Sequence, residues 1–271
     1  MQTLILMRYS YFGLSGWQSG ASRDLDRLLS SERLAKRINL LENIALRSLA
    51  DQTDEDFKLV VLSSRAMPKW RQRQLTSLCK DMLGDDRADV IFRRQGSAHA
   101  KFKNHIHENY GDAPLTCQVV LDDDDALASD FVEKLKPEAE AAIQNVSGRH
   151  AHTFMSFPEG VSLKLGQDGA QLFERDVPFT NLGLSLVAPT QAKFTVYGLA
   201  HKKVTRRHPT RVIYRQEPSY IRTVHDTNDS RAQHGDSAIP TADLPVMIAR
   251  FPCLAQYFEA QLSTDVVKKA A

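Results

Sequence analysis

Four consecutive aspartates, residues 122–125, directly follow the apolar stretch Gln118–Leu121. A short apolar run predicts a strand buried on both faces, and open α/β sheets bind ligands at the carboxyl ends of such strands. Adjacent carboxylates repel one another, and a divalent cation is a usual counter-charge. Because side chains at positions i and i+2 of an extended segment point the same way, we expect Asp122 and Asp124 to converge on one Mn²⁺ or Mg²⁺.

Residues 122–125, here called the aspartate run, have a simpler interpretation as a solvated acidic turn ahead of a helix, whose N-terminus favours negative charge. The buried strand before the run and the apolar Ala126-Leu127 after it favour the metal site. In that case the carboxylates should be partly exposed without metal. The substitution Asp124→Asn should abolish metal-dependent activity and leave the fold intact, since the run would contribute repulsion rather than packing.

The elements that would position the aspartate run alternate between strand and helix. Helices are predicted from Leu34 to Leu49 and from Pro68 to Gly84, where apolar residues recur at helical spacing. Apolar, β-branched runs predict strands, and these lie at Thr3–Met7, Phe57–Leu62, Val90–Phe92 and Gln118–Leu121. This order predicts an α/β fold with a mainly parallel sheet between helices.

The pattern changes after about residue 148. Short strand-like segments alternate there with Gly, Pro and Asn, which predicts an antiparallel, loop-rich second half. No linker separates the two parts, so we expect a single domain over 1–271 with halves 1–147 and 148–271. The polar stretch Asp226–Leu244 predicts a mobile loop.

Composition excludes several classes of protein. Hydrophobic and charged contents of 42% and 25% are ordinary for a globular chain, and the net charge of +2 does not indicate a nucleic-acid partner. No apolar run approaches a membrane span. Three widely separated cysteines form neither a disulfide framework nor a CxxC metal site, so we expect buried thiols and a cytoplasmic location.

Several motifs carry a resemblance to a known family. Val119–Leu127, with the aspartate run inside it, resembles the DxD signature of GT-A glycosyltransferases, and Leu46–Ser64 resembles their second helix–strand unit. With Arg8-Tyr9-Ser10, the chain is most similar to bacterial rhamnosyltransferases. The resemblance covers most of Thr3 to Asp130 and recurs in patches to about Ser230. It implies a GT-A-like fold and a nucleotide-diphosphate sugar donor such as dTDP-rhamnose. The implied acceptor is a cell-surface glycan or its lipid-linked precursor.

The resemblance also implies roles for particular residues. Donor-binding candidates lie at the end of the first strand, after the third strand and in the aspartate run: Arg8, Ser10, Gly96, Lys101, Lys103, Asp122 and Asp123. His225 matches the late histidine that completes the metal site when the donor is bound. In that site Asp124 would hold the cation either together with Asp122 or through the diphosphate of the donor. The alternatives are solvated helix lysines for Lys101 and Lys103, and an ordinary structural histidine for His225.

Charge is distributed unevenly along the chain. Residues 177–216 contain no Asp or Glu but hold seven cations. Arg207 and Arg211 are the candidates within this stretch for stabilising the leaving diphosphate. Peripheral contact of segment 193–215 with anionic lipid or an acidic glycan is a second interpretation, and a solvated basic face is a third.

The general base for the acceptor hydroxyl is the least constrained assignment. Glu174, Asp176 and His201 are the candidates, because the family's usual acidic residue at a helix start has no counterpart here.

Two other classes of function compete with glycosyl transfer. A phosphatase of the haloacid-dehalogenase type would place its aspartates on the first strand, and a non-catalytic glycan- or membrane-binding module could use the same fold.

Overall fold

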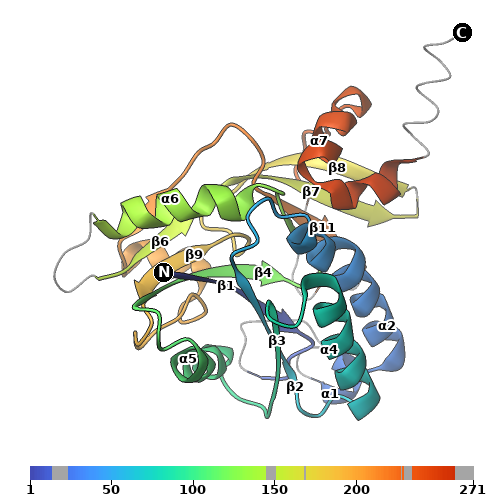
Figure 1. Ribbon diagram of the computed structural model, residues 1–271. Coiled ribbons are helices and arrows are strands. Elements are labelled where there is room, and N and C mark those ends of the chain that lie inside the picture. Colours follow the sequence, from blue (N-terminus) through green and yellow to red (C-terminus); the bar gives the residue numbers. More distant parts are fainter. Residues whose placement is uncertain (14–23, 145–150, 168, 227, 229–233, 260–271) are drawn as a thin grey trace, which may run out of the picture.

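A seven-stranded mixed sheet organises the molecule (Figure 1). The computed structural model describes residues 1–13, 24–144, 151–167, 169–226, 228 and 234–259. The strands lie in the order β10-β6-β9-β4-β1-β2-β3. Their bounds are β1 Gln2–Tyr9, β2 Lys58–Ser64, β3 Ala88–Arg93, β4 Leu115–Asp122, β6 Thr153–Ser156, β9 Ser185–Pro189 and β10 Thr210–Val212.

The centre of this sheet is parallel, as the sequence predicted. β1 lies between β2 and β4 and pairs in parallel with both, so that Ile5 is opposite Leu59 on one side and Val119 on the other. β3 continues the parallel order beyond β2. Leu4, Ile5, Val119 and Val120 are fully buried, as expected for strands covered on both faces. The carboxyl ends of β1, β2 and β4 therefore meet at one edge.

Helices cover both faces of the sheet. One core joins Ile5 to a long helical stretch made of α2 (Ser31–Leu40), the π-helical segment η2 (Leu41–Leu46) and α3 (Arg47–Ala50), and to α4 (Lys69–Leu83) and α6 (Phe131–Gln144). The second core joins Leu4 to α5 (Ala98–Asn109). Figure 1 shows α5 on the opposite side of the strands from α2 and α4.

The second half of the chain is more mixed than the sequence predicted. β9 is antiparallel to both β4 and β6, as expected, but β10 pairs in parallel with β6. A parallel pair needs a crossover of a dozen or more residues, and the residues between β6 and β10 supply one. The expected loop at Asp226–Leu244 includes residues 227 and 229–233, which lie outside the described part of the chain, and it contains the 3₁₀ turn Thr241–Asp243.

A smaller sheet lies beside the large one, in the order β5-β11-β7-β8. β5 (Ala126–Leu127) follows the aspartate run and pairs antiparallel with β11 (Tyr220–Val224). β7 (Glu159–Gly166) pairs in parallel with β11 and antiparallel with β8 (Gly169–Asp176). The helix α7 (Leu244–Arg250) packs into the same core. This sheet brings residues after 220 next to the aspartate run.

Two further sequence predictions can be compared with the structure. Cys79, Cys117 and Cys253 are buried and free, which confirms them as core residues. Burial raises the pKa of each thiol to about 12. Among the residues that the structure describes, no helix is long and apolar enough to cross a membrane.

Gln52 links three elements beneath the site and gives a test of this architecture. Its amide donates to the carbonyls of Ser48 (2.9 Å) and Ala128 (2.7 Å), and its oxygen accepts from the first turn of α6 at Val132 (3.0 Å). Gln52→Leu leaves these buried groups unpaired, so we expect the free energy of unfolding in urea to fall by about 3 kcal/mol. Gln74→Leu, on the exposed face of α4, should change it by less than about 0.5 kcal/mol. Equal effects of the two substitutions would contradict this role.

Candidate active site at the end of strand β4

The aspartate run forms a turn at the carboxyl edge of the sheet. β4 ends at Asp122, and the backbone N–H of Asp125 donates to the carbonyl of Asp122 (3.3 Å). The premise that residues 122–124 continue as one extended segment is therefore wrong, because the chain turns after Asp122. The side chains of Asp122 and Asp124 contact different partners.

The carboxylates are more buried than expected. Asp123 and Asp125 are fully buried and Asp124 is 3% exposed, while the side chain of Asp122 retains 13% exposure. The expectation of four partly exposed carboxylates is thus wrong for three of them. Arginines rather than water compensate their charge.

Arg37 is the first of these arginines. It lies on α2 and is 3% exposed, and its guanidinium reaches two successive carboxylates. Nε and Nη2 donate to both oxygens of Asp123, and Nη1 donates to Oδ2 of Asp124 at 3.0 Å. Such a two-point contact uses the planar fork that distinguishes arginine from lysine. One side chain therefore fixes the tip of the turn.

Arg222 and Arg8 hold the two ends of the run. Arg222, on β11, donates to Asp125 at 2.6 Å and lies 3.6 Å from Asp122. Arg8, at the end of β1, donates to the other oxygen of Asp122 at 3.2 Å. Asn181 also reaches Asp122 (3.4 Å), and the backbone N–H of Thr223 donates to Asp125 (2.8 Å).

Burial and these contacts shift the pKa values of neighbouring carboxyls. Burial tends to raise the pKa of Asp124, but the charge of Arg37, the hydrogen bond from His225 and the charge of Arg222 hold that pKa well below its usual range. Burial raises the pKa of Asp125 to about 8, with the charges of Asp124 and Asp122 adding to the rise and Arg222 opposing it. Neighbouring carboxyls of the run thus have pKa values shifted in opposite directions.

His225 lies against Asp124, although 101 residues separate them. Its Nε2 is 2.9 Å from Oδ2 of Asp124, and the amide of Asn228 donates to the same oxygen at 3.1 Å. The pairing of β5 with β11 produces this meeting, because β11 runs back alongside the run. The late histidine and the DxD aspartate are thus together, as the resemblance implied.

Asp124 and His225 fit a divalent cation only with help from a ligand. In the described part of the chain, no group of three or more His, Cys, Asp or Glu side chains could hold a metal. Mg²⁺ is commonly bound by one or two carboxylates together with substrate phosphates. The carboxylate of Asp124 fits that pattern, and a neutral imidazole such as that of His225 is a suitable additional ligand for Mn²⁺. Oδ2 of Asp124 also accepts from Arg37 and Asn228, so these residues do not form a closed all-protein site.

The proposed nucleoside contacts lie along the same edge. Ser10 follows β1, is 2% exposed and has a positive φ of 43°. Its hydroxyl has no hydrogen-bond partner among the residues described, so it is a buried polar group that a ligand could satisfy. Lys101 on α5 lies close to Gly96, where an added Cβ would come within 3.2 Å of the lysine Cε. Lys103, on the same helix, is half-buried.

The remaining predicted residues lie on other elements. Arg211 pairs with Glu138 on α6 at 3.0 Å, and Arg207 is exposed after the 3₁₀ helix η3 (His201–Arg206). Glu174 and Asp176 are exposed on β8, the edge strand of the small sheet. His201 is half-buried at the start of η3. Their roles stay predictions.

Four participants were not among the predicted site residues: Arg37, Arg222, Asn228 and Asn181, the last of which reaches Asp122. Arg37 lies on the apolar face of α2, between Leu34 and Leu41. A charged residue on a buried face indicates a buried ion pair, and this pattern could have identified Arg37 from the sequence. Arg222 lies within β11 and Asn228 beyond it, and no local sequence pattern identifies either of them as a site residue.

The premise that the run contributes only repulsion is also wrong, because Asp124 is ion-paired. Asp124→Asn should therefore cost stability.

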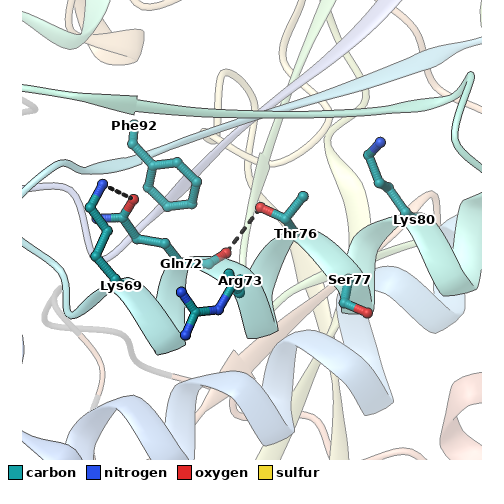
Figure 2. Close-up of a pocket in the computed structure, with 7 residues that line it drawn as sticks. All are labelled: Lys69, Gln72, Arg73, Thr76, Ser77, Lys80 and Phe92. Carbon is teal, nitrogen blue, oxygen red and sulfur yellow. Dashed lines mark hydrogen bonds between the residues drawn. The ribbon is translucent and has the colours of Figure 1, made fainter.

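A pocket of about 460 Å³ lies elsewhere, along the outer side of α4 (Figure 2). Lys69, Arg73 and Lys80 line it with Phe92 of β3. Lys69 contacts Gln72 at 3.4 Å, and Lys80 pairs with Asp85 at 2.9 Å. The pocket lies away from the aspartate run and supplies none of its chemistry.

The fold is a mixed α/β architecture with a mainly parallel sheet, and its acidic residues gather at the end of β4. Residues 2–237 match the family model described as "Putative rhamnosyl transferase". The chain therefore belongs to this family and is, by family, a glycosyltransferase. The predicted family and the predicted α/β fold with a mainly parallel sheet are therefore confirmed.

Solved structures give further similarities. S. aureus TarS 1-349 has 14% identity and a TM-score of 0.42, with 82% of this chain and 60% of that chain covered. A protein from Desulfovibrio desulfuricans G20, described as a "putative nucleotide-diphospho-sugar transferase", has 11% identity and a TM-score of 0.35, with 84% of each chain covered. Comparison with curated proteins gave no match.

The role of Arg37 can be tested through stability. Arg37→Met leaves Asp123 and Asp124 buried without their cation, so we expect the free energy of unfolding to fall by about 3–5 kcal/mol. Arg47→Met removes a surface pair with Asp51 in the same helical stretch and should cost less than about 1 kcal/mol. Urea denaturation compares them. A small effect at Arg37 would mean that the guanidinium does not hold the run.

Chelation should not unfold the protein. The arginines already compensate the buried carboxylates, so folding does not depend on a metal as it does in a zinc finger. We expect the Tm to be unchanged by EDTA, measured by calorimetry without nucleotide. A large fall in Tm would show that a structural metal, and not arginine, neutralises the run.

Proposed function

We propose that this chain transfers a sugar from a nucleotide-diphosphate donor to a cell-surface glycan or a lipid-linked precursor, with Mn²⁺ or Mg²⁺ held at Asp124 and His225. The observation that carries the proposal is the 2.9 Å contact between these two side chains at the carboxyl edge of the sheet. Family membership supports a glycosyl transfer, and the fold supports a donor bound at this edge.

The metal would be held by the protein and the donor together. Asp124 and His225 are two candidate ligands, and the diphosphate of the donor completes the set. When bound, the cation neutralises negative charge that develops on the leaving diphosphate. Arg222 adds a fixed positive charge beside Asp122 and Asp125.

The donor's nucleoside is assigned to the ends of the parallel strands. Ser10 offers a buried hydroxyl without a partner among the described residues. Arg8 lies beside it with its guanidinium over the ring of Tyr197 (4.8 Å) and on Asp122. Arg8 therefore positions Asp122 at the point where ribose or phosphate would enter.

Rhamnose is the proposed sugar, on the basis of the family description. Asn181 reaches Asp122 from the loop before β9, so we place the acceptor on that side of the run. Glu174, Asp176 and His201 stay the candidates for the general base. Single substitutions followed by pH–rate profiles choose among them, because loss of the base removes one limb of the profile.

A panel of thymidine, uridine and guanosine diphosphate sugars with Mn²⁺ tests the proposed function. A true donor at about 100-fold over its dissociation constant stabilises the protein by roughly 2.7 kcal/mol, which appears as a rise in Tm. Turnover is then measured with that donor. No rise in Tm and no turnover across the panel would favour a non-catalytic binding module.

Substitutions at the proposed metal ligands sharpen the test. His225→Gln should lower kcat/KM by at least about tenfold, and Asp124→Asn should abolish turnover. Because Asp124→Asn also loses an ion pair, activity is compared at a temperature where the variant is folded. Asp86→Asn and His107→Gln, away from the run, are the matched controls. Full activity of His225→Gln would remove this histidine from the metal site.

A further inference from the structure

The first two turns of α4 carry an exposed tryptophan among cations. This α4 start surface consists of Lys69, Trp70, Arg71 and Arg73. Trp70 is 52% exposed, and the guanidinium of Arg71 lies 4.0 Å from the centre of its ring. Lys69 and Arg73 are exposed and line the same pocket (Figure 2). Because residues three or four apart are neighbours on a helix surface, Arg73 lies beside both Lys69 and Trp70, and the ring and the cations are contiguous.

The positive charge of the α4 start surface is not neutralised. Residues 57–80 contain six Lys and Arg and no Asp or Glu. Lys69 donates to the side-chain oxygen of Gln72 (3.4 Å) and Arg71 to that of Gln74 (2.7 Å), and both acceptors are uncharged. Within the described part of the chain, no cation of this surface forms an ion pair. Its charge is therefore available to an anionic partner.

The cations do not stabilise the helix on which they lie. α4 has no acidic residue in its first turn, and its N-cap Pro68 makes no side-chain capping hydrogen bond. Because the helix macrodipole places partial positive charge at this end, cations are unfavourable there. A role in binding accounts for them better than a role in folding.

The α4 start surface lies at the edge of the sheet that holds Asp122. β1 is parallel to β2 and β4, and Arg8 is the register partner of Leu62 on one side and of Asp122 on the other. β2 ends at Ser64, and residues 65–68 connect it directly to α4. Two strand spacings, about 10 Å, separate β2 from β4. The start of α4 and the candidate active site therefore share the carboxyl edge.

We propose that the α4 start surface docks this protein on an anionic lipid bilayer, with the ring of Trp70 in the headgroup region and Lys69 and Arg73 on lipid phosphates. Tryptophan favours the membrane–water interface, and each basic residue near an anionic membrane adds to binding. One occupant thus accounts for the exposed ring and for the unpaired cations. Docking here brings the edge that holds Asp122 to the membrane. The inference deepens the proposed function, on whose lipid-linked acceptor it rests.

Vesicle flotation tests the proposal without donor, metal or turnover, so that it fails separately from the proposed function. The full chain should float with phosphatidylcholine vesicles that contain phosphatidylglycerol and not with pure phosphatidylcholine. Lys69→Gln with Arg73→Gln should weaken binding about 30-fold. Trp70→Ser should weaken it without changing the net charge. Absence of flotation with anionic vesicles would overturn the proposal.

Tryptophan fluorescence reports whether Trp70 itself enters the headgroup region. The chain has two tryptophans, so Trp17→Phe leaves Trp70 as the only one. Its emission should shift to shorter wavelength on anionic vesicles, and lipids brominated near the headgroup should quench it. Flotation without this shift and quenching would show that another surface binds the vesicle and would overturn the proposal.

The matched control is Lys203→Gln with Arg206→Gln, which removes the same charge from exposed positions on η3. η3 leads to His208, whose ring contacts His152 (2.8 Å) ahead of β6. This control should bind vesicles like the unsubstituted protein. A loss in the control equal to or larger than that in the α4 variant would overturn the proposal, because net charge or segment 193–215 would then account for binding. Retention on a soluble acidic polysaccharide without vesicle binding would also overturn it and would assign the surface to a glycan.

Discussion

The contact between Arg37 and two successive aspartates is the constraint on which the site depends. Four adjacent carboxylates at the end of a buried strand need compensating charge, and here Arg37, Arg222 and Arg8 supply it. They come from α2, β11 and β1, so the helical layer and both sheets must be assembled before the aspartate run is stable. Because a buried ion pair is costly to break, the turn keeps one geometry.

In this arrangement some aspartates of the run stabilise the fold, and others are placed where a ligand could contact them. Asp123 and Asp125 are fully buried and serve the structure, whereas Asp122 retains some exposure and Asp124 meets His225. The arginines supply positive charge to the run from within the protein. The residues left for chemistry are then few, which is consistent with a cation whose ligands come partly from the donor.

Sequence patterns predicted the parts that depend on local periodicity. The four parallel strands and the helices between them follow from apolar runs and helical spacing, and the aspartate run was placed correctly after β4. The geometry of the run was not predictable in this way. Arg37 lies 86 residues from Asp123 and Arg222 lies 97 residues from Asp125, and no local pattern pairs such positions. The turn from Asp122 to Asp125 was also not predicted, because the argument from the sequence assumed that residues 122–124 continue the extended strand. His225 was found through family resemblance, not spacing.

The central claim is that Asp124 and His225 form a half-site for a divalent cation that the donor completes. Mn²⁺ affinity, measured by electron paramagnetic resonance with and without a nucleoside diphosphate, tests this claim most directly. The account predicts weak Mn²⁺ binding alone, much tighter binding with the nucleotide, and loss of that gain in His225→Gln. Equal Mn²⁺ affinity with and without nucleotide, or a gain that survives His225→Gln, would contradict it.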